Sequence, residues 1–124
     1  MSHEWNFHIS TGLIFVDGMS IGAQFYSGNG VGLNNVSMER IEGVGPIPRG
    51  GWTIDRWDDV HGTKGPIVAV LSPNEGTNTF GRSEFLIHGD NGLGNHSASH
   101  GCIILSRPWR EKLRETGLNQ IIVL

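Results

Sequence analysis

Glycine is the feature that most restricts how this chain can fold. Nineteen of the 124 residues are glycine, about twice the usual share of roughly 7%. They are spread along the chain without a fixed period, so no repeat architecture is indicated. Glycine tolerates the left-handed backbone that tight turns need. The chain is therefore predicted to form many short β-strands joined by tight turns.

Short apolar runs recur between these turns and predict seven or eight strands. Trp5, Phe7 and Ile9 alternate with polar residues, which is the period of a half-buried strand. The segment 27–48 is dense in Gly, Asn and Pro and is predicted to be loop, with at most one helical turn at 37–41. The predicted strands cover residues 5–9, 13–16, 21–26, 51–57, 66–71, 84–88, 101–105 and 121–124.

One helix is predicted, over residues 107–116. Ser106 can cap its start, Pro108 suits its first turn, and Gly117 can end it. Strands and helices do not alternate, which argues against a parallel doubly wound sheet. The length suits one core. We expect a single domain over residues 1–124 that is mainly β and mainly antiparallel, with one C-terminal α-helix.

Composition and charge exclude several classes of partner. The formal net charge is −3 and the isoelectric point is near 6.0, so no basic stripe is expected for nucleic acid or anionic membranes. No apolar run reaches the roughly 18 residues of a membrane span, and the N-terminus shows no signal peptide. The glycines at 28–32 do not have the spacing of a dinucleotide site. No cofactor and no membrane insertion are expected.

Chemically reactive side chains are concentrated around the only cysteine, Cys102. His88, His96 and His100 all lie within the fourteen residues before it. A neighbouring imidazole can lower the pKa of a thiol, by forming a thiolate–imidazolium pair, and accept its proton. Gly101 leaves the adjacent backbone uncovered, so amide N–H groups can face a developing oxyanion. The segment therefore supplies a nucleophile and a base.

Two other interpretations of Cys102 stay open from the residues alone. A lone cysteine is most often a small buried residue, here at the start of a strand. Alternatively, the three histidines and Cys102 make a possible zinc site. The His100-Gly-Cys102 spacing fits usual zinc ligand pairs poorly, and His96 is better explained as an ordinary loop residue, so no metal is expected.

The same residues carry a resemblance to a known family. His88 followed by Ser99-His100-Gly101-Cys102 resembles the signature of the L,D-transpeptidase catalytic domain, a histidine followed by [Ser/Thr]-His-Gly-Cys. Other segments are similar to a smaller group, the L,D-transpeptidase-like exchange effectors delivered by type VI secretion. These segments are Tyr26-Ser-Gly-Asn-Gly30, Val44-Gly-Pro-Ile-Pro-Arg-Gly50 and Phe85-Leu-Ile-His-Gly-Asp90.

The resemblance implies a role for each motif residue. Cys102 would be the nucleophile and His88 the base that activates it. His100 would orient the loop, with Ser99 supporting it. The amides of Gly101 and Cys102 would form the oxyanion hole.

Two departures from the family concern the substrate. The interval from His88 to Cys102 is short, and Ile104 stands where many members have Arg or Asn. A guanidinium can bind a carboxylate through two parallel hydrogen bonds, so the missing positive charge is expected from another arginine (Arg82, Arg49 or Arg107). Asp90, which ends the last of the similar segments, is also expected to contact substrate.

The resemblance further implies action on peptidoglycan tetrapeptide stems. The cysteine would attack the bond before the terminal D-alanine and form a thioester, which water, a free D-amino acid or a second stem amine would resolve. Hydrolysis or exchange in the periplasm of a target bacterium would deprive that cell of cross-linking donors. We therefore expect a secreted antibacterial effector, cytoplasmic before delivery, with an immunity protein as a further partner.

Three alternatives make different predictions. A non-catalytic peptidoglycan-binding or structural module of a phage or secretion particle would keep its phenotype after Cys102→Ala. A papain-like peptidase or wall amidase would cut elsewhere in the stem, and such families usually place the cysteine before the histidine. A zinc hydrolase would contain stoichiometric metal.

Overall fold

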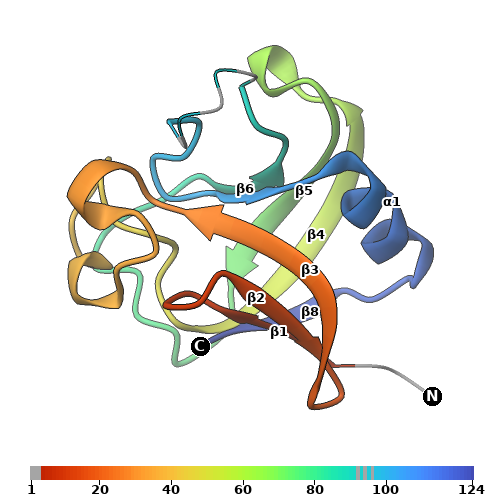
Figure 1. Cartoon of the computed structure of the whole chain (residues 1–124), viewed down its shortest axis with the longest axis horizontal. Coiled ribbons are helices and arrows are strands. Elements are labelled where there is room, and N and C mark those ends of the chain that lie inside the picture. The colour runs from red at the N-terminus through yellow and green to blue at the C-terminus, as the bar shows by residue number, and fades with distance from the viewer. Residues whose placement is uncertain (1–3, 92, 94, 96) are drawn as a thin grey trace.

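The computed structural model describes residues 4–91, 93, 95 and 97–124. Within this part of the chain, strands form one closed barrel in the order β1-β2-β3-β7-β6-β5-β4-β8 (Figure 1). One α-helix, α1 (Arg107–Glu115), and three 3₁₀ turns, η1 (Gly30–Gly32), η2 (Val36–Met38) and η3 (Gly62–Lys64), accompany them. The strands are β1 (Trp5–His8), β2 (Leu13–Val16), β3 (Met19–Ser27), β4 (Gly50–Val60), β5 (Pro66–Pro73), β6 (Phe85–His88), β7 (Ile103–Leu105) and β8 (Gln120–Val123).

Two parallel pairings close the barrel. Six of the neighbouring pairs are antiparallel, as predicted. The pairs β1–β8 and β6–β7 are parallel, which the sequence did not predict. A local alternation of apolar residues identifies a strand but not its partner. The β1–β8 pairing joins the two ends of the chain, and closure removes the exposed sheet edges.

Some details of the elements differ from the prediction, and the first of them affects the site. β7 begins at Ile103 instead of residue 101, so Gly101 and Cys102 lie just outside the strand. The segment 27–48 contains two 3₁₀ turns, η1 and η2, where one helical turn was predicted. Ser106 stands at the N-cap of α1 but its side chain makes no capping hydrogen bond. Gly117, with φ +71°, follows the helix as predicted.

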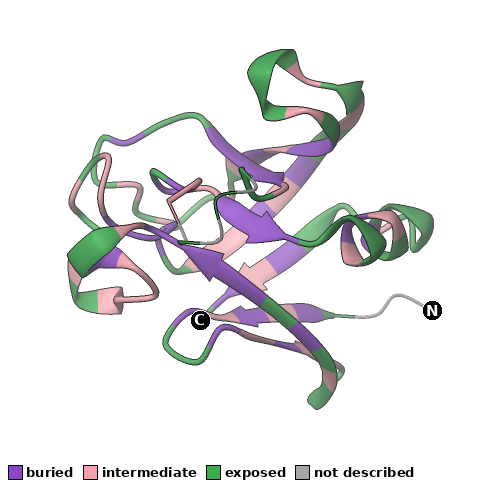
Figure 2. Cartoon of the chain, turned by 45° about the horizontal axis from the view of Figure 1, so that its top comes forward, coloured by how far each residue is buried: buried purple, intermediate pink, exposed green. Residues whose placement is uncertain are grey.

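Aromatic and branched side chains fill the barrel interior. Figure 2 shows the buried residues gathered on the strands and the exposed ones on turns and on the outer side of α1. The Phe7 and Phe25 rings meet edge to face with centroids 5.2 Å apart, and Trp52 meets Phe85 at 4.8 Å. Burying each such side chain contributes about 1.5–3 kcal/mol. The Trp52 indole N–H donates to the Pro48 carbonyl at 3.0 Å, which satisfies its polar atom.

A buried arginine attaches α1 to the barrel. Leu113 is fully buried, and Arg110 donates to the carbonyls of Ile67 (2.9 Å), Leu105 (2.5 Å) and Pro66 (3.3 Å). Burial lowers the pKa of Arg110.

In the described part of the chain, no helix combines the length and the apolarity needed to cross a bilayer.

The glycine-rich segment between β3 and β4 packs backbone against backbone. A Cβ atom on Gly28, Gly32 or Gly45 would overlap carbonyl groups of neighbouring loop residues. In Figure 1 this segment forms the compact group of turns at one end of β3. Its glycines are therefore required by close packing, which lets the segment form a firm support next to Cys102.

Candidate active site

Cys102 lies at the point where the chain enters β7. Ile103 pairs with Ile87 of the parallel strand β6, so Cys102 comes beside Leu86. The Leu86 backbone N–H hydrogen-bonds the sulfur, and the thiol donates to the Glu84 carbonyl at 3.8 Å. The side chain is partly exposed. The structure therefore does not place Cys102 in the closed core that the packing interpretation required.

Two buried serines hold the backbone around Cys102. The hydroxyls of Ser99 and Ser27 both donate to the Cys102 carbonyl, at 2.6 and 2.9 Å. Ser99 Oγ also accepts from the N–H groups of Gly28 (2.9 Å) and Gly101 (3.1 Å). Both serines are fully buried. Loss of one partner would leave buried polar groups unpaired, at a cost of about 1–3 kcal/mol each.

Gly101 has a conformation and an environment that exclude a side chain. Its φ is +133°, and a Cβ atom there would overlap Nη2 of Arg82. Its N–H points to Ser99 Oγ. The prediction that this amide faces a developing oxyanion therefore does not describe the present conformation, because the amide is already used to shape the turn.

His88 ends β6 and is 3% exposed. Its Nδ1 lies 2.8 Å from the Gly89 carbonyl oxygen. A carbonyl can only accept, so Nδ1 carries the proton and Nε2 has the free lone pair. Nε2 is buried and has no hydrogen-bond partner among the described residues. An unpaired buried acceptor is uncommon in proteins, and here it is the nitrogen that a general base would use.

Burial favours the neutral forms of both predicted reactants. Burial lowers the pKa of His88, and the positive charges of Lys64 and Arg110 lower it further. Burial raises the pKa of the Cys102 thiol, although the Leu86 N–H, Lys64 and Arg82 act in the opposite direction. The thiolate–imidazolium pair expected from the sequence is thus not the resting state. The site instead holds a thiol and a neutral imidazole.

Two adjoining cavities surround these groups. One of about 510 Å³ is lined by Cys102, Gly101 and His100 together with residues of β5, of β6 and of the connections before β4, between β4 and β5, and between β5 and β6. A smaller one of about 260 Å³ is lined by His88, Asp90 and neighbouring loop residues. Both share Lys64, Ala98 and His100. The cavity of the thiol and the cavity of the histidine therefore adjoin at these three residues.

Arg82 lines the cysteine cavity, as one of the arginines that the sequence proposed for a carboxylate. It is 6% exposed and donates to the carbonyls of Glu39, Pro46 (2.8 Å) and Gly45 (3.0 Å). Its guanidinium carbon lies 5.2 Å from the centre of the Phe85 ring. Much of its hydrogen-bonding capacity therefore fixes the glycine-rich segment.

The two other arginines lie away from this cavity. Arg107 pairs with Glu111 on the exposed side of α1, at 3.0 Å. Arg49 pairs with Glu39 at 3.0 Å and lines a separate surface hollow. The prediction that either arginine faces the cysteine is not met in this conformation. The sequence could not separate them, because their distance from Cys102 depends on the closure of the barrel.

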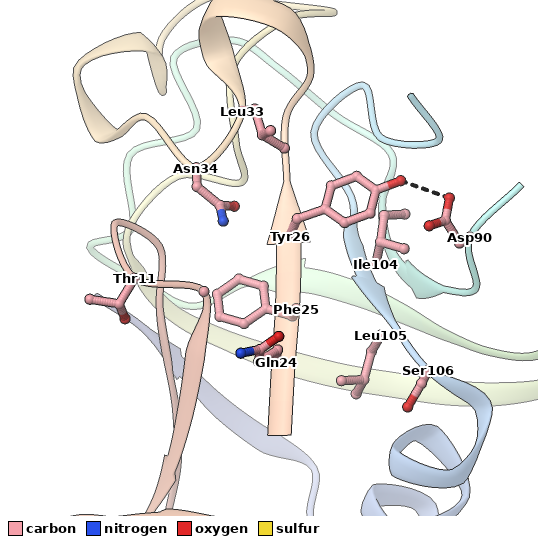
Figure 3. Close-up of a pocket in the computed structure, with 11 residues that line it drawn as sticks. Thr11, Gln24, Phe25, Tyr26, Leu33, Asn34, Asp90, Ile104, Leu105 and Ser106 are labelled. Atoms are coloured by element: carbon pink, nitrogen blue, oxygen red, sulfur yellow. Dashed lines mark hydrogen bonds between the residues drawn. The ribbon is translucent and has the colours of Figure 1, made fainter. Parts of the chain in front are cut away.

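Asp90 joins the loop after β6 to strand β3. Tyr26 donates its hydroxyl to Asp90 Oδ1 at 2.9 Å (Figure 3). The same hydroxyl accepts from the Ala98 N–H at 3.1 Å. Burial, followed by the contact with Asp90, raises the pKa of Tyr26 to about 12. The phenol therefore stays protonated and ties both ends of the loop to β3. Asp90 also lines a cavity of about 370 Å³ over β3 and β7.

Several residues at the site had no role in the sequence interpretation. Ser27 supports the cysteine turn, and Asn29 donates to the Ser99 carbonyl at 2.7 Å. Both lie in the Tyr26–Gly30 segment that resembles the effectors, which was the available signal. Lys64 and His61 line the cysteine cavity from the turn between β4 and β5, a position that no motif marked.

The zinc interpretation depends partly on His96, which lies outside the described residues. Among the residues that are described, no group of three or more His, Cys, Asp or Glu side chains is arranged to hold a metal ion. The candidate site therefore consists of the Cys102 thiol, the His88 imidazole and the turn that holds Cys102.

Solved structures share this fold. An L,D-transpeptidase from Xylanimonas cellulosilytica has a TM-score of 0.59 and 17% identity, over 99% of this chain and 60% of that one. An L,D-transpeptidase from Stackebrandtia nassauensis has a TM-score of 0.60 and 16% identity, over 100% of this chain and 56% of that one. An L,D-transpeptidase from Mycobacterium smegmatis has a TM-score of 0.54 and 17% identity, over 99% of this chain and 58% of that one. The chain thus spans less than two thirds of each, and the likeness establishes an L,D-transpeptidase-like fold.

Sequence comparison identifies the family more narrowly. A search of curated proteins gives no match. The sequence model of the Tlde1 domain matches residues 22–121, which run from within β3 to the first half of β8 and include the whole cysteine turn. This range covers most of the chain and contains His88 and Cys102. The chain belongs to the Tlde1 domain family, the type VI L,D-transpeptidase effectors.

Proposed function

We propose that this protein is a cysteine-dependent L,D-acyl transferase that trims or exchanges the terminal D-residue of peptidoglycan tetrapeptide stems. The observation that carries the proposal is the state of His88. Its proton is fixed on Nδ1 by the Gly89 carbonyl, while Nε2 is buried and has no partner among the residues that the structure describes. His88 ends the strand that pairs with β7, which follows Cys102. This is the arrangement that a general base needs before substrate binds. Membership of the family supports the substrate class.

The neutral pair implies proton transfer during attack. His88 Nε2 takes the proton of the Cys102 thiol as the sulfur bonds to the carbonyl carbon at the L-centre of the diamino acid. The Leu86 N–H and the positive charges of Lys64 and Arg82, which already lower the thiol pKa, stabilise the developing negative charge. The imidazolium then protonates the departing amine of D-alanine, and the carbon–nitrogen bond breaks. A thioester on Cys102 remains.

The fate of the thioester defines the activity. Attack by water gives an L,D-carboxypeptidase product, and attack by the amine of a free D-amino acid gives an exchanged stem. In both cases His88 takes a proton from the attacking group and returns it to the sulfur. Either product lacks the D-alanine donor bond that a cell needs for cross-linking. This outcome supports an antibacterial role in the periplasm of a target cell.

Product masses test the reaction directly. The purified protein is incubated with a disaccharide-tetrapeptide, with and without an added D-amino acid, beside Cys102→Ala and His88→Ala variants. Loss or replacement of one D-alanine by the unmodified protein alone supports the proposal. Cleavage at another stem bond would indicate a different peptidase, and binding without turnover would indicate a peptidoglycan-binding module.

The effector role needs a separate experiment. The chain is expressed in a test bacterium either with an appended export signal or without one, and growth is followed. We expect lysis or rounding only with export, and only when Cys102 is intact. Equal toxicity of the Cys102→Ala variant would separate the phenotype from the proposed chemistry.

A further inference from the structure

Lys64 is placed where it can act on both cavities of the site. It lines the cavity of Cys102 and the adjoining cavity of His88. Its charge acts on both groups, since it lowers the pKa of each. No sequence motif includes Lys64, and neither the fold nor the cysteine turn requires it, because the side chain is exposed on the turn η3.

The turn that carries Lys64 has a defined shape. The Lys64 N–H donates to the His61 carbonyl at 2.8 Å, and the His61 N–H donates to the Gly65 carbonyl at 2.9 Å. Gly62 and Gly65 have positive φ angles of +46° and +84°, which permit the tight reversal. The hairpin of β4 and β5 therefore presents Lys64 to the cavities from a fixed base.

Lys64 also has an uncommitted charge. In the described part of the chain, no ion pair or side-chain hydrogen bond involves its ammonium. The guanidinium of Arg82, the other cation of the cysteine cavity, donates to three backbone carbonyls. Glu42 and Glu84 line the same cavity, and neither forms an ion pair with Lys64. An anionic ligand in this space would therefore meet Lys64 as its available partner.

The proposed substrate brings such an anion close to the thiol. The terminal D-alanine carries a free carboxylate one residue beyond the bond that Cys102 attacks. In extended backbone one residue spans roughly 3.3–3.6 Å, so this carboxylate must lie within the same pair of cavities. We infer that Lys64 binds the terminal carboxylate of the leaving D-residue, an inference that rests on the proposed function. Lys64 would then make the protein specific for free C-terminal ends.

The same subsite would receive the incoming residue in exchange. A free D-amino acid has its carboxylate on the carbon that carries its attacking amine, as the departing D-alanine does. Binding that carboxylate to Lys64 directs the amine toward the thioester on Cys102. Exchange would therefore depend on Lys64 twice, whereas hydrolysis of the thioester by water would depend on it only in the first half of the reaction.

The test compares a tetrapeptide stem that ends in a free carboxylate with the same stem ending in a carboxamide. Binding is measured calorimetrically in the Cys102→Ala background, so the result does not require turnover. We expect the carboxylate form to bind roughly 10- to 100-fold more tightly, the usual effect of a hydrogen bond to a charged group. Lys64→Ala should remove this preference by weakening only the carboxylate form, and Lys64→Arg should restore part of it.

The chain contains a matched control, because Lys112 is its only other lysine and is exposed on α1. Lys112→Ala should leave the preference unchanged. The inference is overturned if both stems bind equally to the parent protein, or if Lys64→Ala weakens them by the same factor. Turnover of the same stems by the protein with Cys102 intact separates this inference from the proposed function. If the binding preference depends on Lys64 but no stem is turned over, only the acyl-transfer chemistry is contradicted.

Discussion

The protonation states of two side chains determine how this site can begin its reaction. Burial holds Cys102 as a thiol and His88 as a neutral imidazole. A preformed ion pair would give a reactive thiolate at all times, whereas the neutral pair becomes reactive only when substrate and base act together. The neutral pair therefore limits adventitious modification of the cysteine.

The pH dependence of the activity follows from the direction in which the pKa of His88 is shifted. Only neutral imidazole can accept the thiol proton, and burial lowers the pKa of His88. Activity should therefore persist below the ordinary histidine value of about 6.5 and decline as pH falls through the lowered pKa. The profile of kcat/KM against pH measures this limb. An acid limb centred above neutrality would contradict the assignment of His88 as a buried neutral base.

Alkylation of Cys102 provides an independent check. Because burial raises the pKa of the thiol, the rate of reaction with iodoacetamide should still be rising with pH at the ordinary thiol pKa of about 8.5. A plateau at neutral pH would indicate a thiolate and would favour the ion-pair description.

Ser99 shows how one hydroxyl can control the geometry of a nucleophile. Ser99→Ala removes the donor to the Cys102 carbonyl and the acceptor for the N–H groups of Gly28 and Gly101. We expect the free energy of unfolding to fall by about 1–3 kcal/mol and kcat to fall with it. Chemical denaturation and steady-state kinetics measure the two effects. Ser106→Ala is the control, since Ser106 makes no capping hydrogen bond, and a comparable loss there would discredit the argument.

At the scale of elements, the site depends on two neighbouring strands and the loop between them. Parallel pairing sets His88, at the end of β6, opposite Ile104 of β7, two residues after Cys102, although fourteen positions separate His88 and Cys102 in sequence. The loop that covers this interval is tied down by Tyr26, through Asp90 near its start and Ala98 near its end. The short interval between histidine and cysteine is thus anchored to β3 at Asp90 and at Ala98.

Tyr26→Phe tests this anchoring while retaining the ring. The variant loses the hydrogen bonds to Asp90 and Ala98, so the loop should open more often. We expect faster hydrogen exchange at the Ala98 amide and a several-fold lower kcat, with little change in core stability. Hydrogen exchange with mass spectrometry resolves this segment from the rest of the barrel. Unchanged exchange in the loop would show that other contacts hold it.

The elements show which parts of the molecule a sequence can predict. Each strand has an apolar pattern within its own few residues, so strand positions were predicted nearly correctly, and the helix ended where Gly117 allows it. The parallel β1–β8 and β6–β7 pairings bring together distant segments, and no local pattern specifies them. The prediction of a mainly antiparallel domain is confirmed, but it did not include the two parallel pairings that close the barrel.

The same distinction applies to the site. Ser99, His100, Gly101 and Cys102 are contiguous, so their proximity was certain from the sequence. Other segments also contribute groups to the site, such as the Ser27 hydroxyl and the Lys64 ammonium. Their places at the site depend on the tertiary structure and could not be predicted from the local sequence. Arg82 lines the cysteine cavity, but its use of three loop carbonyls depends on a backbone conformation that composition does not reveal.

At the scale of the whole molecule, one continuous barrel holds both the core and the site. β1 pairs with β2 on one side and β8 on the other, so the first strand completes the closure. Phe7 of β1 is fully buried and meets Phe25 of β3 across the interior. Because β3 also pairs with β7, which follows Cys102, a disturbance in β1 can reach the cysteine turn through the core.

Phe7→Ala tests whether the molecule unfolds as this single unit. Removing a buried phenylalanine typically costs about 3–5 kcal/mol, a large share of the roughly 5–15 kcal/mol that stabilises a domain. We expect the denaturation midpoints of circular dichroism and of Cys102 alkylation to coincide in the parent protein and to shift together in the variant. Phe15→Ala, on the partly exposed side of β2, should shift both much less. If Cys102 became reactive at lower denaturant than the loss of β-structure, the cysteine turn would unfold separately, and closure of the barrel would not be what protects the site.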